Sequence, residues 1–156
     1  MRVGQGFDVH PFAPDEARPL VLGGVVIAGE RGLAGHSDAD PLAHALADAL
    51  LGAAGLGDLG RHFPDTDPVW AGADSMALLA SVVSLVAAEG LAVANADCTV
   101  VAERPRLAEH LPEMARRLSA TVGAPVSVKA TRAEGLGALG RAEGIAALAV
   151  VLVEAR

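Results

Sequence analysis

The pattern of apolar and polar positions predicts a chain that alternates between strands and helices. Strand-like stretches begin and end the sequence, and a pair of glycines predicts a turn inside the second stretch. The predicted strands are Arg2–His10, Leu20–Ile27 with its turn at Gly23 and Gly24, Leu91–Glu103, Val126–Thr131 and Ile145–Val153.

Three helical segments are predicted between these strands. The first follows Asp40, a residue type that caps helix N-termini, and Pro41, which suits the first helical position. Its apolar residues recur at helical spacing: Leu42, Ala45, Leu46, Ala49 and Leu50. The second is predicted from Asp74 to Glu89. Pro105–Val122 is also predicted to be helical, with an interruption at Pro112, which has no backbone donor.

These elements predict an α+β fold. We expect a single domain over residues 1–156, with one mixed sheet and helices mainly on one face, in a two-layer arrangement of the ferredoxin-like kind. The composition of 52% apolar and 20% charged residues is that of a globular protein. Aromatic residues make up only 3%, so the core must consist of Ala, Val and Leu. Because small side chains each bury little area, association of subunits is an expected further source of stability.

Charge and cysteine content narrow the classes of function. A net charge of −7 argues against nucleic-acid and anionic-lipid partners. Cys98 is the only cysteine, so neither an intrachain disulfide nor a cysteine-based zinc site can form. The longest apolar stretch, Met76–Ala88, is interrupted by two serines and is too short to span a bilayer. With no signal-peptide pattern at the N-terminus, we expect a cytoplasmic protein with no membrane association.

The strongest chemical signal is a candidate metal site. Asp8 and His10 are two residues apart in a predicted strand, so their side chains point to the same face. His44, one helical turn after Asp40, supplies a third ligand. Two histidines and one carboxylate suit Zn²⁺ or a similar ion and leave one coordination position open. Asp48, four residues after His44, either orients its imidazole or is solvated. The alternative for Asp8 and His10 is an exposed polar strand end.

Three loops carry weaker signals. Gly35–Asp40 precedes a helix N-terminus and suits an anion, although a simple loop with a cap explains it equally well. Gly57–Pro68 contains three carboxylates, which suit a cation or hydroxyl groups, but also a surface turn. Lys129–Gly135 offers two cations, a hydroxyl and a carboxylate, which suit phosphate with Mg²⁺. Two G-x-G-x-x-G matches, Gly55–Gly60 and Gly135–Gly140, lack the strand–turn–helix context of a dinucleotide site.

Taken together in order and spacing, these motifs resemble those of a known family. The matching segments are Gly6–His10, Gly35–Asp38, His44-Ala45, Gly57–Gly60, Phe63–Asp67 and Gly140–Gly144. They closely resemble the 2-C-methyl-D-erythritol 2,4-cyclodiphosphate synthases of non-mevalonate isoprenoid biosynthesis, over essentially the whole chain. The resemblance implies a homotrimer with active sites between subunits. It also implies a phosphorus–oxygen lyase that converts 4-diphosphocytidyl-2-C-methyl-D-erythritol 2-phosphate to the cyclodiphosphate and CMP.

The resemblance also implies roles for individual residues. Zn²⁺ would be held by Asp8, His10 and His44, and Mg²⁺ or Mn²⁺ by Glu134. The implied substrate-binding residues are His36, Ser37, Asp58, Gly60, Phe63 and Asp65. The implied nucleotide-binding residues, from the neighbouring subunit, are Ala102, Pro105, Arg106, Leu107, Ala108, Ala130, Thr131 and Arg132. A candidate anion site on the trimer axis involves Arg141.

The chain departs from the family pattern at a few positions. Thr131 is followed by Arg132 and Ala133 where relatives often have further threonines, Arg106 replaces a common lysine, and Ala138 replaces an aromatic residue of some relatives. No general base is assigned, since the 2-phosphate oxygen of the substrate is already a nucleophile. Two other classes stay open from the residues alone: a metal-dependent hydrolase of nucleotide diphosphates and a non-catalytic nucleotide-binding module.

Overall fold

The computed structural model describes residues 1–156 and confirms most of the predicted elements. In chain order the elements are β1 (Arg2–Pro11), β2 (Pro19–Leu22), β3 (Val25–Arg31), α1 (Pro41–Ala54), α2 (Leu59–His62), the 3-10 helix η1 (Pro68–Trp70), α3 (Ser75–Ala88), β4 (Leu91–Val101), α4 (Leu111–Val122), β5 (Val126–Thr131), α5 (Gly137–Gly140) and β6 (Gly144–Ala155). The short helix α2 lies in the Gly57–Pro68 segment, which we expected to be a loop, and no element was predicted at the positions of η1 and α5.

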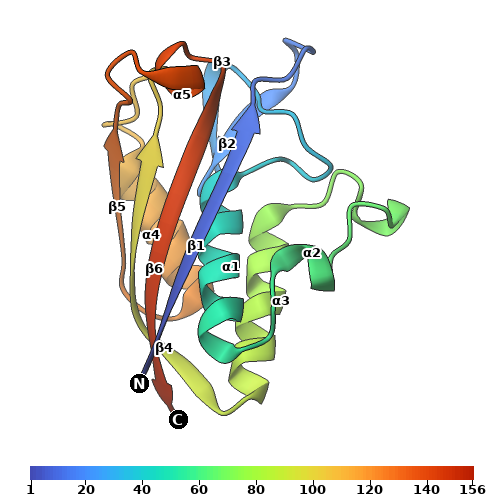
Figure 1. Cartoon of the computed structure of the whole chain (residues 1–156), viewed down its shortest axis with the longest axis vertical. Helices are drawn as coiled ribbons and strands as arrows, with labels where there is room; N and C mark the ends of the chain where they lie inside the picture. The colour runs from blue at the N-terminus through green and yellow to red at the C-terminus, as the bar shows by residue number, and fades with distance from the viewer.

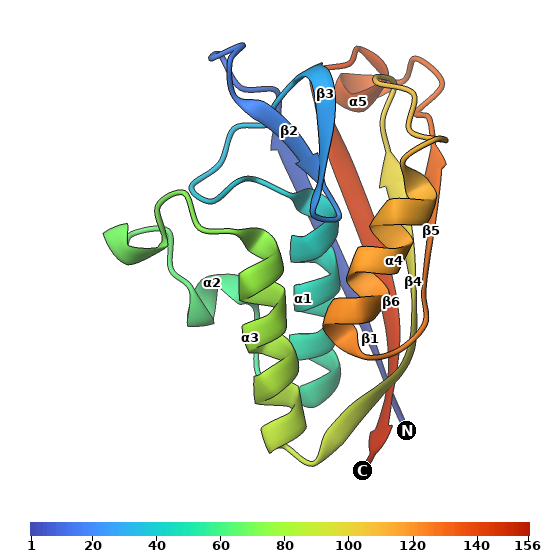
Figure 2. The ribbon, with the colours of Figure 1, turned by 180° about the vertical axis from the view of Figure 1, so that it is seen from behind.

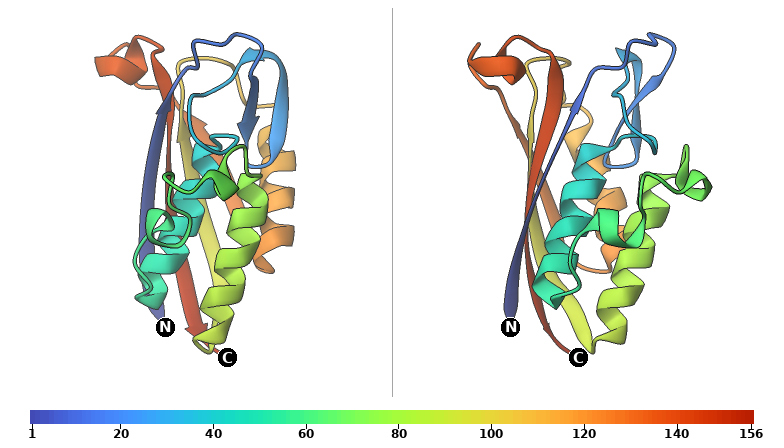
Figure 3. Two further views of the ribbon diagram at one scale, coloured as in Figure 1. Left: turned by 90° about the vertical axis from the view of Figure 1, so that its right-hand side faces the viewer. Right: turned by 45° about the vertical axis from the view of Figure 1, so that its right-hand side comes forward.

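The long strands form a four-stranded mixed sheet in the order β1-β6-β4-β5. β6 pairs antiparallel with both of its neighbours, and β4 pairs parallel with β5. The helices α1, α3 and α4 cover one face of this sheet, as seen edge-on in Figure 3 and from the helical side in Figure 2. The prediction of a two-layer α+β domain with helices on one face is therefore confirmed. Neither α1, α3 nor any other helix has the length and apolar character that crossing a membrane requires.

Three details of the predicted fold are wrong. The β2–β3 hairpin forms a separate two-stranded sheet instead of joining the main one (Figure 1). The ferredoxin-like connectivity is βαββαβ, whereas the main sheet here is built in the order βαβαββ, with α4 connecting the parallel strands β4 and β5. Residues 105–110 are not helical. Helix α4 begins at Leu111, because Pro112 is tolerated only in the first turn, where its missing N–H has no helical acceptor.

The close approach of α1 to β1 depends on two glycines in the strand. A Cβ atom on Gly6 would lie 1.9 Å from the carbonyl oxygen of Ala45, and one on Gly4 would lie 1.9 Å from that of Ala49. The helix backbone therefore rests directly on the strand. Asp8 and His10 continue this inward-facing row of β1 and are half-buried, while their neighbours along the strand are exposed. This packing places the start of α1 beside the two polar residues.

Asp40 fixes the N-terminus of α1 to the hairpin. Its carboxylate accepts hydrogen bonds from the backbone N–H groups of Leu42 and Ala43, as predicted for an N-cap. It also accepts from Gly23 and Gly24 in the β2–β3 turn, at 2.9 and 2.8 Å. Burial raises the pKa of Asp40, and these backbone donors oppose that effect. One buried carboxylate thus joins the hairpin to the helix that carries His44.

The opposite face of the main sheet has no helix over it. Its exposed side chains include large apolar residues of the two adjacent strands β1 and β6: Val3, Phe7, Val9, Leu148 and Val150. Phe7 is 53% exposed, which is unusual for an aromatic side chain in the middle of a strand. Lys129 of β5 forms an ion pair with Asp97 of β4. The chain alone therefore leaves one apolar sheet face accessible to water.

Candidate active site

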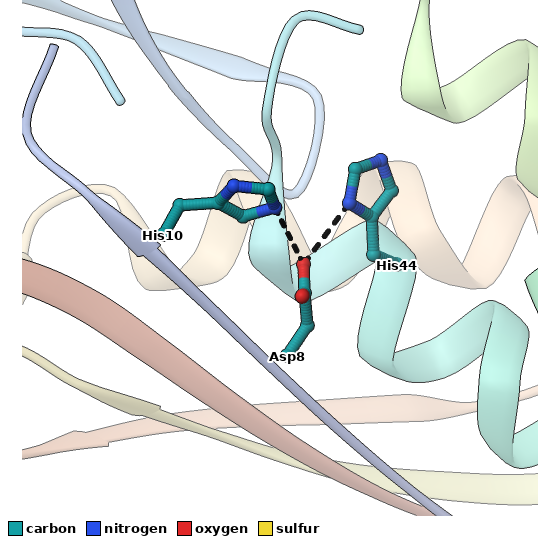
Figure 4. A group of neighbouring side chains, drawn as sticks. All are labelled: Asp8, His10 and His44. Carbon is teal, nitrogen blue, oxygen red and sulfur yellow. Dashed lines mark hydrogen bonds and ion pairs between the residues drawn. The ribbon is translucent and has the colours of Figure 1, made fainter. Parts of the chain in front are cut away.

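Asp8, His10 and His44 form a compact cluster of three potential metal ligands. Asp8 and His10 come from the inward face of β1, and His44 comes from the first turns of α1 (Figure 4). Asp8 Oδ2 lies 2.9 Å from His10 Nε2 and 3.0 Å from His44 Nδ1. The alternation of the strand and the position of the helix start bring these residues together, as the sequence predicted. All three are half-buried.

The contacts of the two imidazole rings fit a divalent metal. His10 Nδ1 lies 2.8 Å from the carbonyl oxygen of Ala34, to which it donates, so the lone pair is on Nε2. His10 Nε2 is buried and makes no hydrogen bond of acceptable geometry, although Asp8 Oδ2 is near. A buried nitrogen without a well-directed partner, next to a carboxylate, is what a metal ligand leaves when no ion is present. The donor set of two imidazoles and one carboxylate suits Zn²⁺.

The electrostatics of the cluster favour a charged Asp8. Burial raises the pKa of Asp8, but the nearby imidazoles of His10 and His44 favour the charged carboxylate, outweigh burial and hold this pKa far below its usual value. For His10, burial lowers the pKa, and the interaction with Asp8 more than compensates, so the pKa is raised. In the absence of a metal, the cluster therefore attracts a proton to His10, and a metal must compete with that proton.

The cluster lies in the wall of a cavity of about 480 Å³. This cavity is lined by residues from β1, α1, α2, α3 and two loops. Five of the lining residues were predicted to bind substrate: His36, Ser37, Gly60, Phe63 and Asp65. Phe63 packs edge-on against Trp70, with ring centroids 4.9 Å apart, and both rings line the cavity. The cavity thus combines acidic and imidazole side chains with an aromatic pair, in a volume that suits a small molecule.

Other predicted site residues lie elsewhere in the chain. Asp58 caps α2 by accepting from the N–H of Arg61 and is absent from the cavity wall. Glu134 is exposed in the loop after β5 and also does not line the cavity. Arg141 is exposed and pairs with Glu143 at 2.5 Å. The predicted substrate pocket and the predicted second-metal ligand are therefore separate within one chain.

The predicted nucleotide residues divide into three groups. Pro105, Arg106 and Ala108 line a second cavity, of about 850 Å³, next to β3. Ala102 and Leu107 are buried in the hydrophobic core. A further group lies at and just beyond the exposed end of β5: Ala130, Thr131 and Arg132. Arg132 is held near this cavity by Glu103, at 3.4 Å, and Glu103 also accepts from the N–H of Gly135, at 3.3 Å.

Contacts in and around the cavity differ from those expected for several residues. Asp48 lines it but accepts from the N–H of Leu59 at 2.7 Å, so its carboxylate fixes the start of α2 instead of orienting His44. The partner of the outer nitrogen of His44 is Ser75, whose Oγ lies 2.8 Å from His44 Nε2. A serine after a helix cap gives no signal of such a contact, because the contact depends on how α3 packs against α1. Trp70, which no motif singled out, packs against Phe63 and also lines the cavity.

Comparison with known proteins agrees with this geometry. The sequence profile of the YgbB family matches residues 1–154. A protein of Symbiobacterium thermophilum named 2-C-methyl-D-erythritol 2,4-cyclodiphosphate synthase is 57% identical over 159 residues, covering 100% of both chains. The bifunctional IspDF from Campylobacter jejuni superposes with a TM-score of 0.94 at 44% identity, over 99% of this chain and 42% of that chain. A CDP-bound 2C-methyl-D-erythritol-2,4-cyclodiphosphate synthase gives a TM-score of 0.88 at 38% identity, over 98% and 100%. Through its full-length match and its three-ligand cluster, the chain belongs to the YgbB family.

Proposed function

We propose that this protein is a cyclodiphosphate synthase of non-mevalonate isoprenoid biosynthesis. Its substrate is 4-diphosphocytidyl-2-C-methyl-D-erythritol 2-phosphate, and its products are 2-C-methyl-D-erythritol 2,4-cyclodiphosphate and CMP. The observation that carries this proposal is the Asp8–His10–His44 cluster opening into a cavity of about 480 Å³. The relatives named for this activity match the whole chain.

The reaction needs positioning and charge stabilisation more than proton abstraction. An oxygen of the 2-phosphate attacks the β-phosphorus, and the bond from that phosphorus to the α-phosphate oxygen breaks to release CMP. The nucleophile is already an anion, and no residue acts as its base. The cavity holds the two reacting groups together, which lowers the entropic part of the barrier. A Zn²⁺ held by Asp8, His10 and His44 would supply Lewis-acid stabilisation of charge on the phosphates.

The remaining cavity residues have roles that follow from their chemistry. Ser37 lines the cavity with a hydroxyl that would donate to a phosphate oxygen. His36 Nε2 lies 3.2 Å from the carbonyl oxygen of Asp67, so His36 would donate to a phosphate through Nδ1 as a doubly protonated ring. Asp65, with the backbone near Gly60 and Phe63, would bind the hydroxyl groups of the methylerythritol portion. Asp58, at the cap of α2, would join them only after a rotation of its side chain.

We propose further that the active protein is a homotrimer whose sites lie between subunits. The uncovered apolar face of the sheet supports an assembly, because burying Phe7, Val9 and Leu148 against a second copy would remove them from water. The separation of Glu134 from the cavity supports sites shared between copies. From the neighbouring copy, Glu134 would hold Mg²⁺ or Mn²⁺, and the cavity lined by Pro105 and Arg106 would receive the cytidine diphosphate portion.

Phosphorus NMR of the substrate incubated with protein, Zn²⁺ and Mg²⁺ tests the activity. We expect a cyclic diphosphate and one equivalent of CMP. Linear diphosphate or phosphate carrying oxygen from water would instead identify a hydrolase. Binding of CDP with no turnover would identify a non-catalytic module. The matched variant His44→Ala should stay folded and lose both bound zinc and turnover, and turnover by metal-free His44→Ala would refute the proposed role of the cluster.

Mixing two inactive variants tests the shared site. His44→Ala removes a ligand from the cavity, and Glu134→Ala removes the proposed second-metal ligand of the neighbouring copy. If each site combines the two residues from different subunits, co-refolding both variants restores activity that neither variant has alone. Two copies of the same variant provide the control. Light scattering during gel filtration gives the mass of the assembly, and an active monomer would refute the trimer.

A further inference from the structure

Hydrogen bonds connect the candidate metal cluster to the start of α3. Figure 4 shows that the second nitrogen of each imidazole points away from Asp8. For His10 this nitrogen donates to a backbone carbonyl, that of Ala34. For His44 it meets side chains: Ser75 Oγ at 2.8 Å and Ser37 Oγ at 3.2 Å. Ser75 is only 1% exposed, so water does not compete for this contact.

Asp38 determines the direction of these hydrogen bonds. One oxygen of its carboxylate lies in very short contact with Ser75 Oγ, and the other accepts from the backbone N–H of Ser75 at 3.2 Å. An ionised carboxylate only accepts, so the hydroxyl proton of Ser75 must point to Asp38. The lone pairs of Ser75 Oγ are then left to accept, and two groups face them, His44 Nε2 at 2.8 Å and the hydroxyl of Ser37 at 3.3 Å, of which His44 Nε2 is the nearer. Donation from Nε2 leaves the Nδ1 lone pair of His44 for a metal, which would replace the direct contact between Nδ1 and Asp8 Oδ2 at 3.0 Å.

We propose that Asp38 and Ser75 are positioning residues for His44. Together they fix the ring orientation and the tautomer that a metal ligand at Nδ1 requires. This inference rests on the proposed metal centre and extends it by an outer layer of two residues, neither of which touches the ion. Ser37 is the weaker partner: its Oγ is farther from His44 and already accepts from the N–H of Ala39 at 3.1 Å. Its hydroxyl also lies 3.3 Å from Ser75 Oγ and would turn from that contact to donate to a phosphate.

The proposal also explains how α3 is attached to the site. Asp38 binds both the side chain and the backbone of the first residue of α3, and the N–H of Asp38 donates to Ala73 at 3.0 Å. Hydrogen bonds thus join the loop before α1 to the start of α3, directly beside His44. A change at Ser75 is expected to alter the metal ligand without removing any residue from the cavity wall.

Zinc affinity, measured by competition with a chromophoric chelator, tests this inference. We expect Ser75→Ala to weaken zinc binding by about 10- to 100-fold, the range seen when outer partners of metal ligands are removed. Ser75→Thr keeps the hydroxyl and should restore most of the affinity. Ser84→Ala is the matched control, because Ser84 lies on the same helix, is exposed and bonds only to the Ala80 carbonyl. It should bind zinc like the native protein.

A second measurement separates positioning from general stability. In the zinc-loaded, ¹⁵N-histidine-labelled protein, the Nε2–H proton of His44 should give a slowly exchanging NMR signal, and this signal should be lost or shifted in Ser75→Ala. Native zinc affinity in Ser75→Ala, or a lowered thermal midpoint with unchanged affinity and unchanged signal, would overturn the inference while leaving the metal centre intact. Failure of the native protein itself to bind zinc would overturn the metal centre and this inference together.

Discussion

Replacing Gly6 by alanine should damage the metal cluster without touching any of its ligands. The added Cβ would lie 1.9 Å from the carbonyl oxygen of Ala45 and 2.8 Å from the backbone nitrogen of Ala49. Real Cβ atoms essentially never approach closer than 3.0 Å, so α1 must move away from β1 by about 1 Å. Both contacted atoms belong to the backbone of α1, so no side-chain rotation can relieve the clash.

This displacement has two consequences of calculable size. Overpacking of a core typically costs about 1–3 kcal/mol, and a backbone clash belongs at the upper end. For a domain of this size, a loss of about 3 kcal/mol lowers the thermal midpoint by roughly 6–12 °C. The same movement carries His44 away from Asp8 and His10. Because ligand geometry must be held within about 0.5 Å, we expect zinc affinity to fall at least about tenfold.

Gly52→Ala provides the matched control on the same helix. A Cβ at Gly52 would meet nothing within 4 Å, and the position is exposed. Alanine favours a helix over glycine by about 0.5–1 kcal/mol, so this variant should be slightly more stable than the native protein and bind zinc normally. Urea unfolding of the zinc-free proteins and chelator competition measure both quantities. If Gly6→Ala unfolds and binds zinc like Gly52→Ala, the argument from close helix–strand packing is wrong.

Three further outcomes are expected from single sites. Asp40→Ala leaves four backbone N–H groups without their acceptor, two of them in the β2–β3 turn. It should lower the free energy of unfolding, measured by urea titration, by about 3–5 kcal/mol. A loss below about 1 kcal/mol would show that water replaces the carboxylate. Without metal, the stabilisation from the Asp8–His10 pair is present above the ordinary Asp8 pKa of 3.8 and is lost as pH rises through the raised His10 pKa. Urea stability should therefore fall as pH rises above 6.5, the ordinary histidine pKa, and should fall less in His10→Gln, whereas zinc affinity should rise with pH. Burial raises the pKa of Cys98 to about 12, so a thiol reagent should label it only upon unfolding, and fast labelling of the native protein would contradict its burial.

Local patterns predicted the parts of the fold that depend on near neighbours in the chain. Asp40 and Pro41 predicted the start of α1, because capping involves only the next few residues. The two-residue spacing of Asp8 and His10 predicted their common face, because alternation is a property of any strand. Val126–Thr131 was predicted with the bounds that the structure shows. The same reasoning failed before Pro112, where polar and apolar spacing suggested a helix that starts only at Leu111.

The sequence by itself thus determined the ligand types, the main elements and, through its ordered motifs, the family. The tertiary structure decided what depends on contacts between distant segments. It separated the β2–β3 hairpin from the main sheet, assigned Asp48 to the start of α2 and brought Ser75 to His44. It also separated Glu134 from the cavity. The physical reason is that these outcomes depend on how closely α1, α3 and the sheet pack. That packing is set by Gly4, Gly6 and the core, and no local sequence pattern predicts it.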